Sequence, residues 1–165
     1  MTTISGKIYS GNRVATQILK TNDETIYNTI GIMPYPGTLN IIFEYPVAFK
    51  TYTQGVSALK LQDGGTVFLI PGYLEGKKVW IYRPLNQPLH FIEIISENQL
   101  RSFLNKTDGD KCDINVNDKY IKELPFIGRV TWILFWYKRT DKTFDNQYRE
   151  FSKRYCRHLG ATEKN

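Results

Sequence analysis

Residues 31–40 read Gly-Ile-Met-Pro-Tyr-Pro-Gly-Thr-Leu-Asn, and residues 92–101 read Ile-Glu-Ile-Ile-Ser-Glu-Asn-Gln-Leu-Arg. In the first stretch, a Pro-Gly turn leads into a β-rich segment, 38–44, in which polar and apolar residues alternate at first. In the second, a strand candidate at 90–95 runs into Ser-Glu-Asn-Gln, a capping-box pattern that predicts a short helix at about 97–104. Each stretch therefore predicts a strand whose end is marked by a turn or a helix cap.

The rest of the chain is also rich in strand candidates. A helix is expected to begin near residue 23 and to stop at Gly31, and Asp63-Gly64-Gly65 has the composition of a hairpin turn. Many short strands with two short helices indicate a mainly β domain of the barrel or sandwich-like class. The further strand candidates are residues 3–10, 56–61, 66–70, 78–82 and 111–117.

Composition limits the class of protein. The chain has 165 residues, of which 41% are hydrophobic and 14% aromatic, so it fits one domain with a short appendage and is not a disordered protein. The longest apolar run, residues 132–137, is too short to span a membrane, and residues 1–7 lack a signal-peptide pattern. Cys112 and Cys156 match no zinc spacing, and we interpret them as free thiols of a cytoplasmic protein.

The net charge of +6 is unevenly distributed. Residues 1–118 contain 11 basic and 11 acidic side chains, whereas residues 119–165 contain 11 basic and 5 acidic ones. Of the 23 aromatic residues, 10 also lie in the second part. This shift in composition predicts a core domain at 1–118 followed by a basic, aromatic C-terminal extension at 119–165.

The two quoted stretches, followed by Asp108-Gly109-Asp110, resemble the archaeal-type CTP-dependent riboflavin kinases in their order and separation. The resemblance covers about residues 5–117. It implies a compact six-stranded cradle-loop barrel. It also implies that the γ-phosphoryl group of CTP is transferred to a hydroxyl of riboflavin, which gives FMN, and that Mg²⁺ takes part.

The resemblance also assigns roles to residues. Thr38 and Asn40 match the metal-binding pair, and Glu93 matches a carboxylate beside the ribityl chain, where it would accept the hydroxyl proton. Oxygen ligands of this kind suit Mg²⁺, and an arginine suits a phosphate. The residues implied in nucleotide binding are Gly11, Asn12, Arg13, Val14, Ala15, Thr16, Asn98, Gln99, Leu100 and Arg101.

The chain departs from the family pattern in two places. Of the family's glycine-rich phosphate loop, Gly11 alone remains, and Arg13 either supplies side-chain charge in place of the missing backbone contacts or is a surface residue without that role. Leu85 stands where the family has a threonine at the flavin pocket. Two alternatives therefore stay open: a related CTP-dependent kinase with another hydroxylated substrate, and a non-catalytic nucleotide-binding barrel whose basic tail binds membrane or nucleic acid.

The extension contains two further patterns. Residues 130–137 form either a buried strand or a buried helix, because a short apolar run does not distinguish them. Aromatic residues recur at helical spacing over 144–155, with basic residues on the other faces. We expect a helix that packs on the barrel or on a partner subunit. Contact with a membrane surface is the second interpretation, and nucleic-acid binding is the least favoured, since no nucleic-acid motif accompanies the charge.

Overall fold

The computed structural model describes residues 1–12, 14–85 and 87–145. Its strands are β1 (Thr2–Tyr9), β2 (Leu39–Ile42), β3 (Ala48–Phe49), β4 (Ser57–Lys60), β5 (Thr66–Leu74), β6 (Lys77–Pro84), β7 (Phe91–Ile95), β8 (Lys111–Val116) and β9 (Ile121–Lys122). Its helices are α1 (Val14–Thr21), α2 (Asp23–Ile30), α3 (Leu100–Leu104) and α4 (Phe126–Trp136), with 3-10 turns η1 (Asp118–Tyr120) and η2 (Thr140–Phe144).

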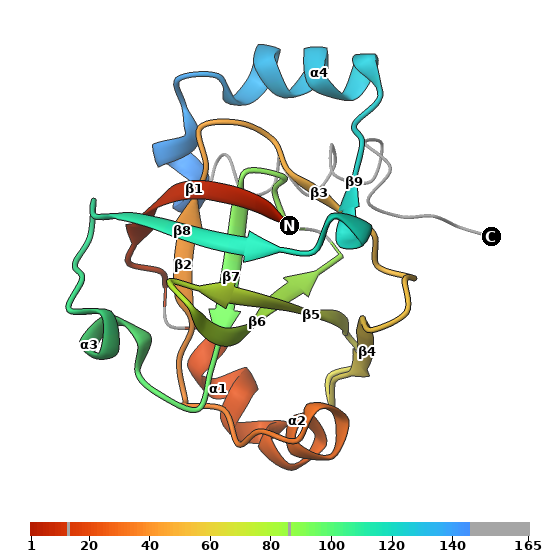
Figure 1. The fold of residues 1–165 in the computed structure, drawn as a ribbon, viewed down its shortest axis with the longest axis vertical. Helices are drawn as coiled ribbons and strands as arrows, with labels where there is room; N and C mark the ends of the chain where they lie inside the picture. Colours follow the sequence, from red (N-terminus) through yellow and green to blue (C-terminus); the bar gives the residue numbers. More distant parts are fainter. Residues whose placement is uncertain (13, 86, 146–165) are drawn as a thin grey trace.

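Six strands close into an antiparallel barrel (Figure 1). They pair in the order β5-β6-β7-β2-β1-β8, and β8 pairs back onto β5 through Gly72↔Val116 and Leu74↔Ile114. Strand β4 pairs with β5 and lies outside this ring. Closure removes the unpaired edges of the six strands. The predicted six-stranded barrel is therefore confirmed.

Strand alternation separates two apolar clusters. Residues that point into the barrel form the larger cluster, which includes Ile8, Ile41, Ile81, Ile92, Ile94 and Ile114, all buried. Alternate residues of β6 and β7, Tyr82 and Ile95, point outward and pack with Leu19 of α1 and Ile26 of α2. The two helices therefore cover part of the outer face of β6 and β7.

The helices differ in part from those expected from the sequence. Helix α2 ends at Gly31 as predicted, because Gly31 adopts a left-handed φ of 74°. Helix α1 was not predicted; it has no acidic first turn and is held by burial of Leu19. The predicted capping box is wrong, because the Ser96 hydroxyl accepts from the Asn98 amide at 3.1 Å and no side-chain bond caps α3 at Gln99.

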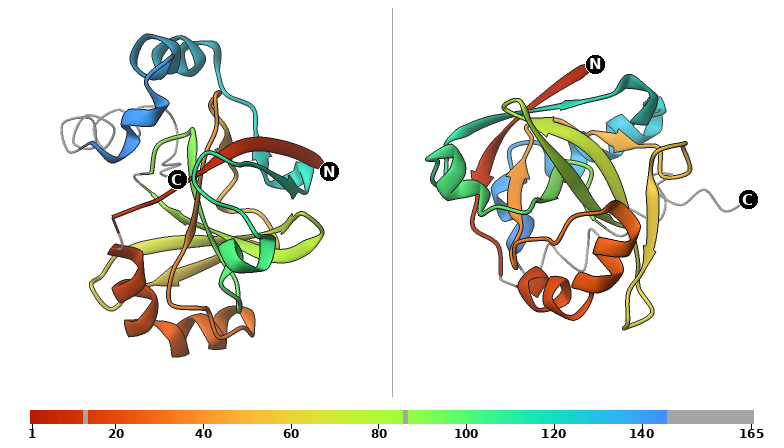
Figure 2. Two further views of the ribbon diagram at one scale, coloured as in Figure 1. Left: turned by 90° about the vertical axis from the view of Figure 1, so that its left-hand side faces the viewer. Right: turned by 60° about the horizontal axis from the view of Figure 1, so that its bottom comes forward.

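The apolar run at 130–137 belongs to helix α4, not to a strand. This helix lies at the opposite end of the barrel from α1 and α2 (Figures 1 and 2). Trp132 and Trp136 are buried against Leu89 of the β6–β7 loop, whereas Ile133 and Leu134 are exposed. The amphipathic helix expected at 144–155 falls almost entirely outside the described residues. Within the described part of the chain, no helix combines the length and hydrophobicity needed to cross a membrane.

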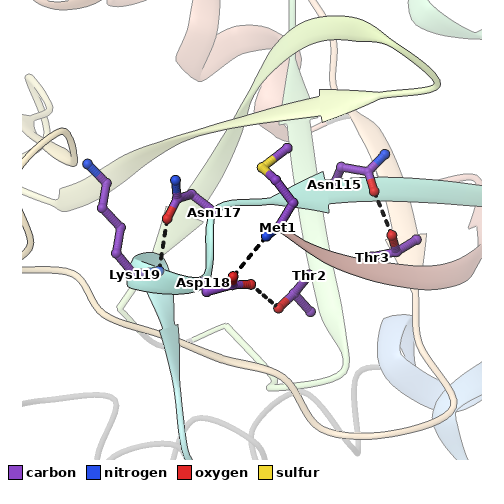
Figure 3. A network of polar contacts seen from close by, with 7 residues as sticks. All are labelled: Met1, Thr2, Thr3, Asn115, Asn117, Asp118 and Lys119. Atoms are coloured by element: carbon purple, nitrogen blue, oxygen red, sulfur yellow. Dashed lines mark hydrogen bonds and ion pairs between the residues drawn. The ribbon is translucent and has the colours of Figure 1, made fainter.

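Polar contacts join the first residues to the end of β8 (Figure 3). Asp118 accepts bonds from the terminal amine of Met1 at 2.8 Å and from the Thr2 hydroxyl at 2.6 Å. The Thr3 hydroxyl donates to Asn115 Oδ1 at 2.6 Å. The two bonds to Asp118 continue the β1–β8 ladder beyond its last pair, Thr2↔Val116, whereas the bond between Thr3 and Asn115 lies within it.

A buried histidine joins the extension to the barrel. Trp132 Nε1 of α4 donates to His90 Nδ1 at 3.1 Å, and His90 Nε2 lies 2.8 Å from the Thr143 hydroxyl of η2. Because Nδ1 accepts, neutral His90 carries its proton on Nε2 and donates it to Thr143, whose hydroxyl donates to the Thr140 carbonyl. Burial, aided by the positive charge of Arg83, lowers the pKa of His90 to about 3.

This pKa predicts a pH-dependent stability. His90 has an ordinary pKa of 6.5 in the unfolded chain and about 3 in the folded one, so below pH 6.5 the unfolded state binds the proton preferentially. The contribution of neutral His90 to the free energy of unfolding is complete above pH 6.5. Below pH 6.5 it decreases by about 1.4 kcal/mol per pH unit, which is a loss of about 2 kcal/mol at pH 5. We expect urea unfolding at pH 7 and pH 5 to show this loss in the wild type and a smaller one in His90→Gln. Equal losses in both proteins would contradict this account of His90.

Candidate functional site

Four residues form a row across neighbouring strands on the outer face of the barrel. Tyr9 of β1 pairs with Asn40 of β2, Asn40 with Glu93 of β7, and Glu93 with Tyr82 of β6. Burial raises the pKa of Tyr82 well above its usual value, and the negative charge of Glu93 raises it further. Asn40 and Glu93 are therefore direct cross-strand neighbours, although they are far apart in the sequence.

Three oxygen atoms from the predicted site converge at this row. The Thr38 hydroxyl lies 3.3 Å from Asn40 Oδ1 and 3.3 Å from Glu93 Oε1. Its single proton serves one of these acceptors at a time, and both distances are long for hydrogen bonds between oxygens. A hydroxyl, an amide oxygen and a carboxylate are ligands that hard divalent cations prefer. Thr38 and Asn40 thus fit a divalent metal that takes its remaining ligands from phosphate and water, and the Glu93 carboxylate lies beside them as the candidate proton acceptor.

Asn40 differs from expectation in its burial. The alternation with Leu39 and Ile41 predicts an outward position, and Asn40 does point out of the barrel, but it is 6% exposed. The loop after β1 covers it, because a Cβ built on Gly11 would lie 2.3 Å from Asn40 Nδ2. A side chain at position 11 would therefore require the Asn40 amide to shift. Among the described residues, no three His, Cys, Asp or Glu side chains lie together as possible metal ligands, so the oxygens of Thr38 and Asn40 are the metal candidate.

The two predicted nucleotide-binding segments lie close to each other. Arg101 pairs with Asp108 at 2.5 Å, and Asp108 accepts from the Ser10 amide at 3.0 Å, directly before Gly11. Burial opposes ionisation of Asp108, but the bonds from Ser10 and Arg101 outweigh it and hold its pKa below the usual value. The pair therefore brings the end of β1 beside α3 and leaves Arg101 partly exposed.

The remaining predicted nucleotide contacts are placed as follows. Asn98 lies before α3 rather than in its first turn, and its side-chain oxygen accepts from Lys77. Gln99 Oε1 accepts from Ser102, and Leu100 is buried in the barrel core, so its side chain serves packing. Asn12 and Val14 are exposed, and Ala15 and Thr16 of α1 are partly buried. Arg13 lies outside the described residues.

Sequence reasoning missed two residues beside Glu93. Both are 5% exposed; Arg83 lies near the end of β6, and Gln87 lies in the β6–β7 loop. Arg83 Nη1 donates to Gln87 Oε1 at 2.9 Å, and Gln87 Nε2 donates to Glu93 Oε2 at 2.9 Å. Pro84 and Pro88 flank this segment, but nothing in the residue order indicates that Gln87 reaches Glu93.

Leu85, the departure from the family pattern, lies next to a small cavity that Arg83 and Thr51 also line. The cavity measures about 20 Å³ and is lined by Phe49, Phe68, Leu85 and Leu89, among others. This is room for about one water molecule, whereas pockets for drug-sized ligands measure about 300–1,000 Å³. A larger surface depression, about 610 Å³ at Lys122–Arg129, includes no predicted site residue.

Comparison with known proteins decides the family. The model of the CTP-dependent riboflavin kinase domain (domain of unknown function DUF120) matches residues 9–116. The chain belongs to this family. The match ends with β8, the last strand of the barrel, and includes the Thr38, Asn40 and Glu93 cluster. The family's barrel therefore carries the candidate site, and the C-terminal extension lies beyond the matched residues.

Curated riboflavin kinases of archaea are similar to the chain over the same region. The protein of Staphylothermus marinus is 34% identical over 122 residues, which cover 70% of this chain and 92% of the relative. Those of Ignicoccus hospitalis and Pyrobaculum islandicum are 26% and 28% identical, over 70% and 59% of their lengths. These comparisons do not assign individual roles, so the roles of the site residues stay predictions.

Contact between Gly11 and Asn40 gives a testable prediction. Gly11→Ala should press its Cβ against the Asn40 amide, and we expect a loss of about 1–3 kcal/mol in the free energy of unfolding. In an Asn40→Ala background the same substitution should cost much less, because the obstructing amide is gone. The measurement is a double-mutant cycle by urea unfolding. Additive losses would show that Asn40 is not what restricts residue 11.

Proposed function

We propose that this chain is a CTP-dependent riboflavin kinase that converts riboflavin to FMN. Its membership of the kinase family and its similarity to archaeal riboflavin kinases support this activity. The observation that carries the proposal is the convergence of Thr38, Asn40 and Glu93 on one outer patch of the matched barrel. Phosphoryl transfer depends mainly on positioning and on charge neutralisation, and the oxygen atoms of Thr38, Asn40 and Glu93 can serve both.

Kinases of this kind need a divalent cation, and we propose Mg²⁺ held by Thr38 and Asn40. Bound between protein and phosphates, the cation would neutralise negative charge on the phosphate oxygens. The nearby Arg101, already oriented by Asp108, is available to a phosphate, since its side chain is 31% exposed. Asn98 and Gln99 stand at the adjoining exposed surface, where we propose that the cytidine nucleotide binds.

The role we assign to Glu93 is acceptance of a proton. The acceptor hydroxyl of riboflavin forms a bond to the γ-phosphorus of CTP as the bond between that phosphorus and the bridging oxygen of CDP breaks. The hydroxyl proton passes to Glu93 Oε1, which faces Thr38, while Oε2 accepts from Gln87. The products are FMN and CDP, and the proton then leaves to solvent.

Two broader assignments belong to the same proposal. We place the enzyme in the cytoplasm, and the buried free thiol of Cys112 is consistent with a reducing compartment. We also propose that residues 1–118 form the kinase barrel and residues 119–165 an accessory segment. The end of the family match at residue 116 supports that division, and the packing of α4 on the barrel supports a structural role for the segment.

The activity has a direct test. We expect the chain, with riboflavin, CTP and Mg²⁺, to form FMN and CDP in equal amounts, measured by chromatography. Replacing CTP by ATP should slow the reaction, and EDTA should stop it. CTP with Mg²⁺ should also raise the melting temperature, because a ligand that binds the native state stabilises it. CDP release that depends on another alcohol would identify a different acceptor. A melting shift without any turnover would instead favour a non-catalytic nucleotide-binding barrel.

The proposed role of Glu93 predicts a specific defect. Glu93→Gln keeps the size of the side chain and removes the base, so turnover should fall by about 10²–10⁴-fold. The melting shift produced by CTP should stay close to that of the wild type, because the nucleotide contacts lie elsewhere. The matched control is Glu44→Gln, an exposed glutamate paired with Lys7, which should leave turnover unchanged. A fully active Glu93→Gln enzyme would remove Glu93 from the mechanism.

A further inference from the structure

The β6–β7 loop is organised around one buried arginine. Arg83 Nη1 lies 2.9 Å from Gln87 Oε1, 2.9 Å from the Pro88 carbonyl and 2.8 Å from the Phe91 carbonyl. Its Nη2 donates to the Gln87 carbonyl at 2.8 Å. All these acceptors lie between residues 87 and 91. A buried guanidinium needs such partners, so the loop is held in one conformation around the charge.

The arginine also sets the orientation of the Gln87 side chain. With its oxygen toward the guanidinium, the amide can only present its NH₂ group to the opposite side. The reversed orientation would place the Gln87 NH₂ group against the Arg83 guanidinium, two donors facing each other, so the observed orientation is favoured. On that opposite side lies Glu93 Oε2, 2.9 Å from Gln87 Nε2.

The two oxygens of Glu93 consequently have different surroundings. Oε2 accepts from the loop through Gln87, whereas Oε1 lies 3.3 Å from the Thr38 hydroxyl at the candidate metal patch. We propose that Gln87, oriented by Arg83, is a positioning residue that fixes the Glu93 carboxylate so that Oε1 faces the reacting hydroxyl. The expected effect on turnover rests on the proposed kinase activity, but the contact between Gln87 and Glu93 can be tested separately. A displacement of about 1 Å at a reacting group can slow catalysis by about 100-fold.

Gln87→Glu separates positioning from loop stability. The new carboxylate keeps an oxygen for Arg83, so the loop retains its anchor, but it places a negative oxygen where the donor to Glu93 was. We expect kcat to fall by about 10–100-fold at unchanged KM for CTP, with a melting temperature close to that of the wild type. Gln87→Ala should show a similar loss of kcat. Gln54→Ala, at an exposed loop glutamine, is the control and should keep the wild-type kcat. A Gln87→Glu enzyme with wild-type kcat would overturn the proposal.

A second measurement does not depend on turnover. In ¹⁵N-labelled protein, the side-chain amide protons of Gln87 should exchange slowly with water, whereas those of exposed Gln54 exchange fast. Glu93→Ala should remove this protection. Exchange of Gln87 as fast as that of Gln54 in the wild type would overturn the proposal even if the enzyme is active. If no riboflavin is phosphorylated, the proposed function fails, and the exchange measurement still decides whether Gln87 holds Glu93.

Discussion

The site depends on the register between β2 and β7. The pairing Asn40↔Glu93, flanked by Leu39↔Ile94 and Ile41↔Ile92, puts the polar pair on the outer face and the apolar pairs inside the barrel. Because side chains alternate along a strand, a slip of one residue would bury Glu93 in the barrel and expose Ile92 and Ile94. Burial of isoleucines, at about 1.5–3 kcal/mol for each side chain, therefore also sets the position of the polar site.

Much of this arrangement could be predicted from the residues. The alternation around Thr38 and Asn40, the single polar residue within Ile92–Ile95, and the turn at Asp108–Asp110 indicated strands, and the family resemblance supplied their closure into a barrel. The same resemblance brought Thr38, Asn40 and Glu93 together, and the structure places them in contact. Short-range pattern and family order were sufficient here because the site is formed by the backbone ladder itself.

Other features depend on long-range packing, which the residue order does not reveal. Helix α1 has no acidic residue in its first turn, and burial of Leu19 against residues of β4, β5 and β6 stabilises it. The run at 130–137 is apolar on all sides, so its period could not distinguish helix from strand; contacts of Trp132 and Trp136 decide for the helix. At Ser96, a local capping pattern was overridden because the chain bends at Glu97 and Asn98 and is extended at Gln99 before α3 begins.

The β6–β7 loop links the extension to the site because it is held from two sides. On one side, Arg83 binds the backbone of residues 87–91 and orients Gln87 toward Glu93. On the other side, Trp132 and Thr143 of the extension bind His90 in the same loop, and Leu89 packs against both tryptophans. The charge of Arg83 also favours the neutral form of His90, which is the form that can accept from Trp132. One buried charge thus stabilises both contacts, so a segment beyond the family barrel supports the loop that contacts the candidate base.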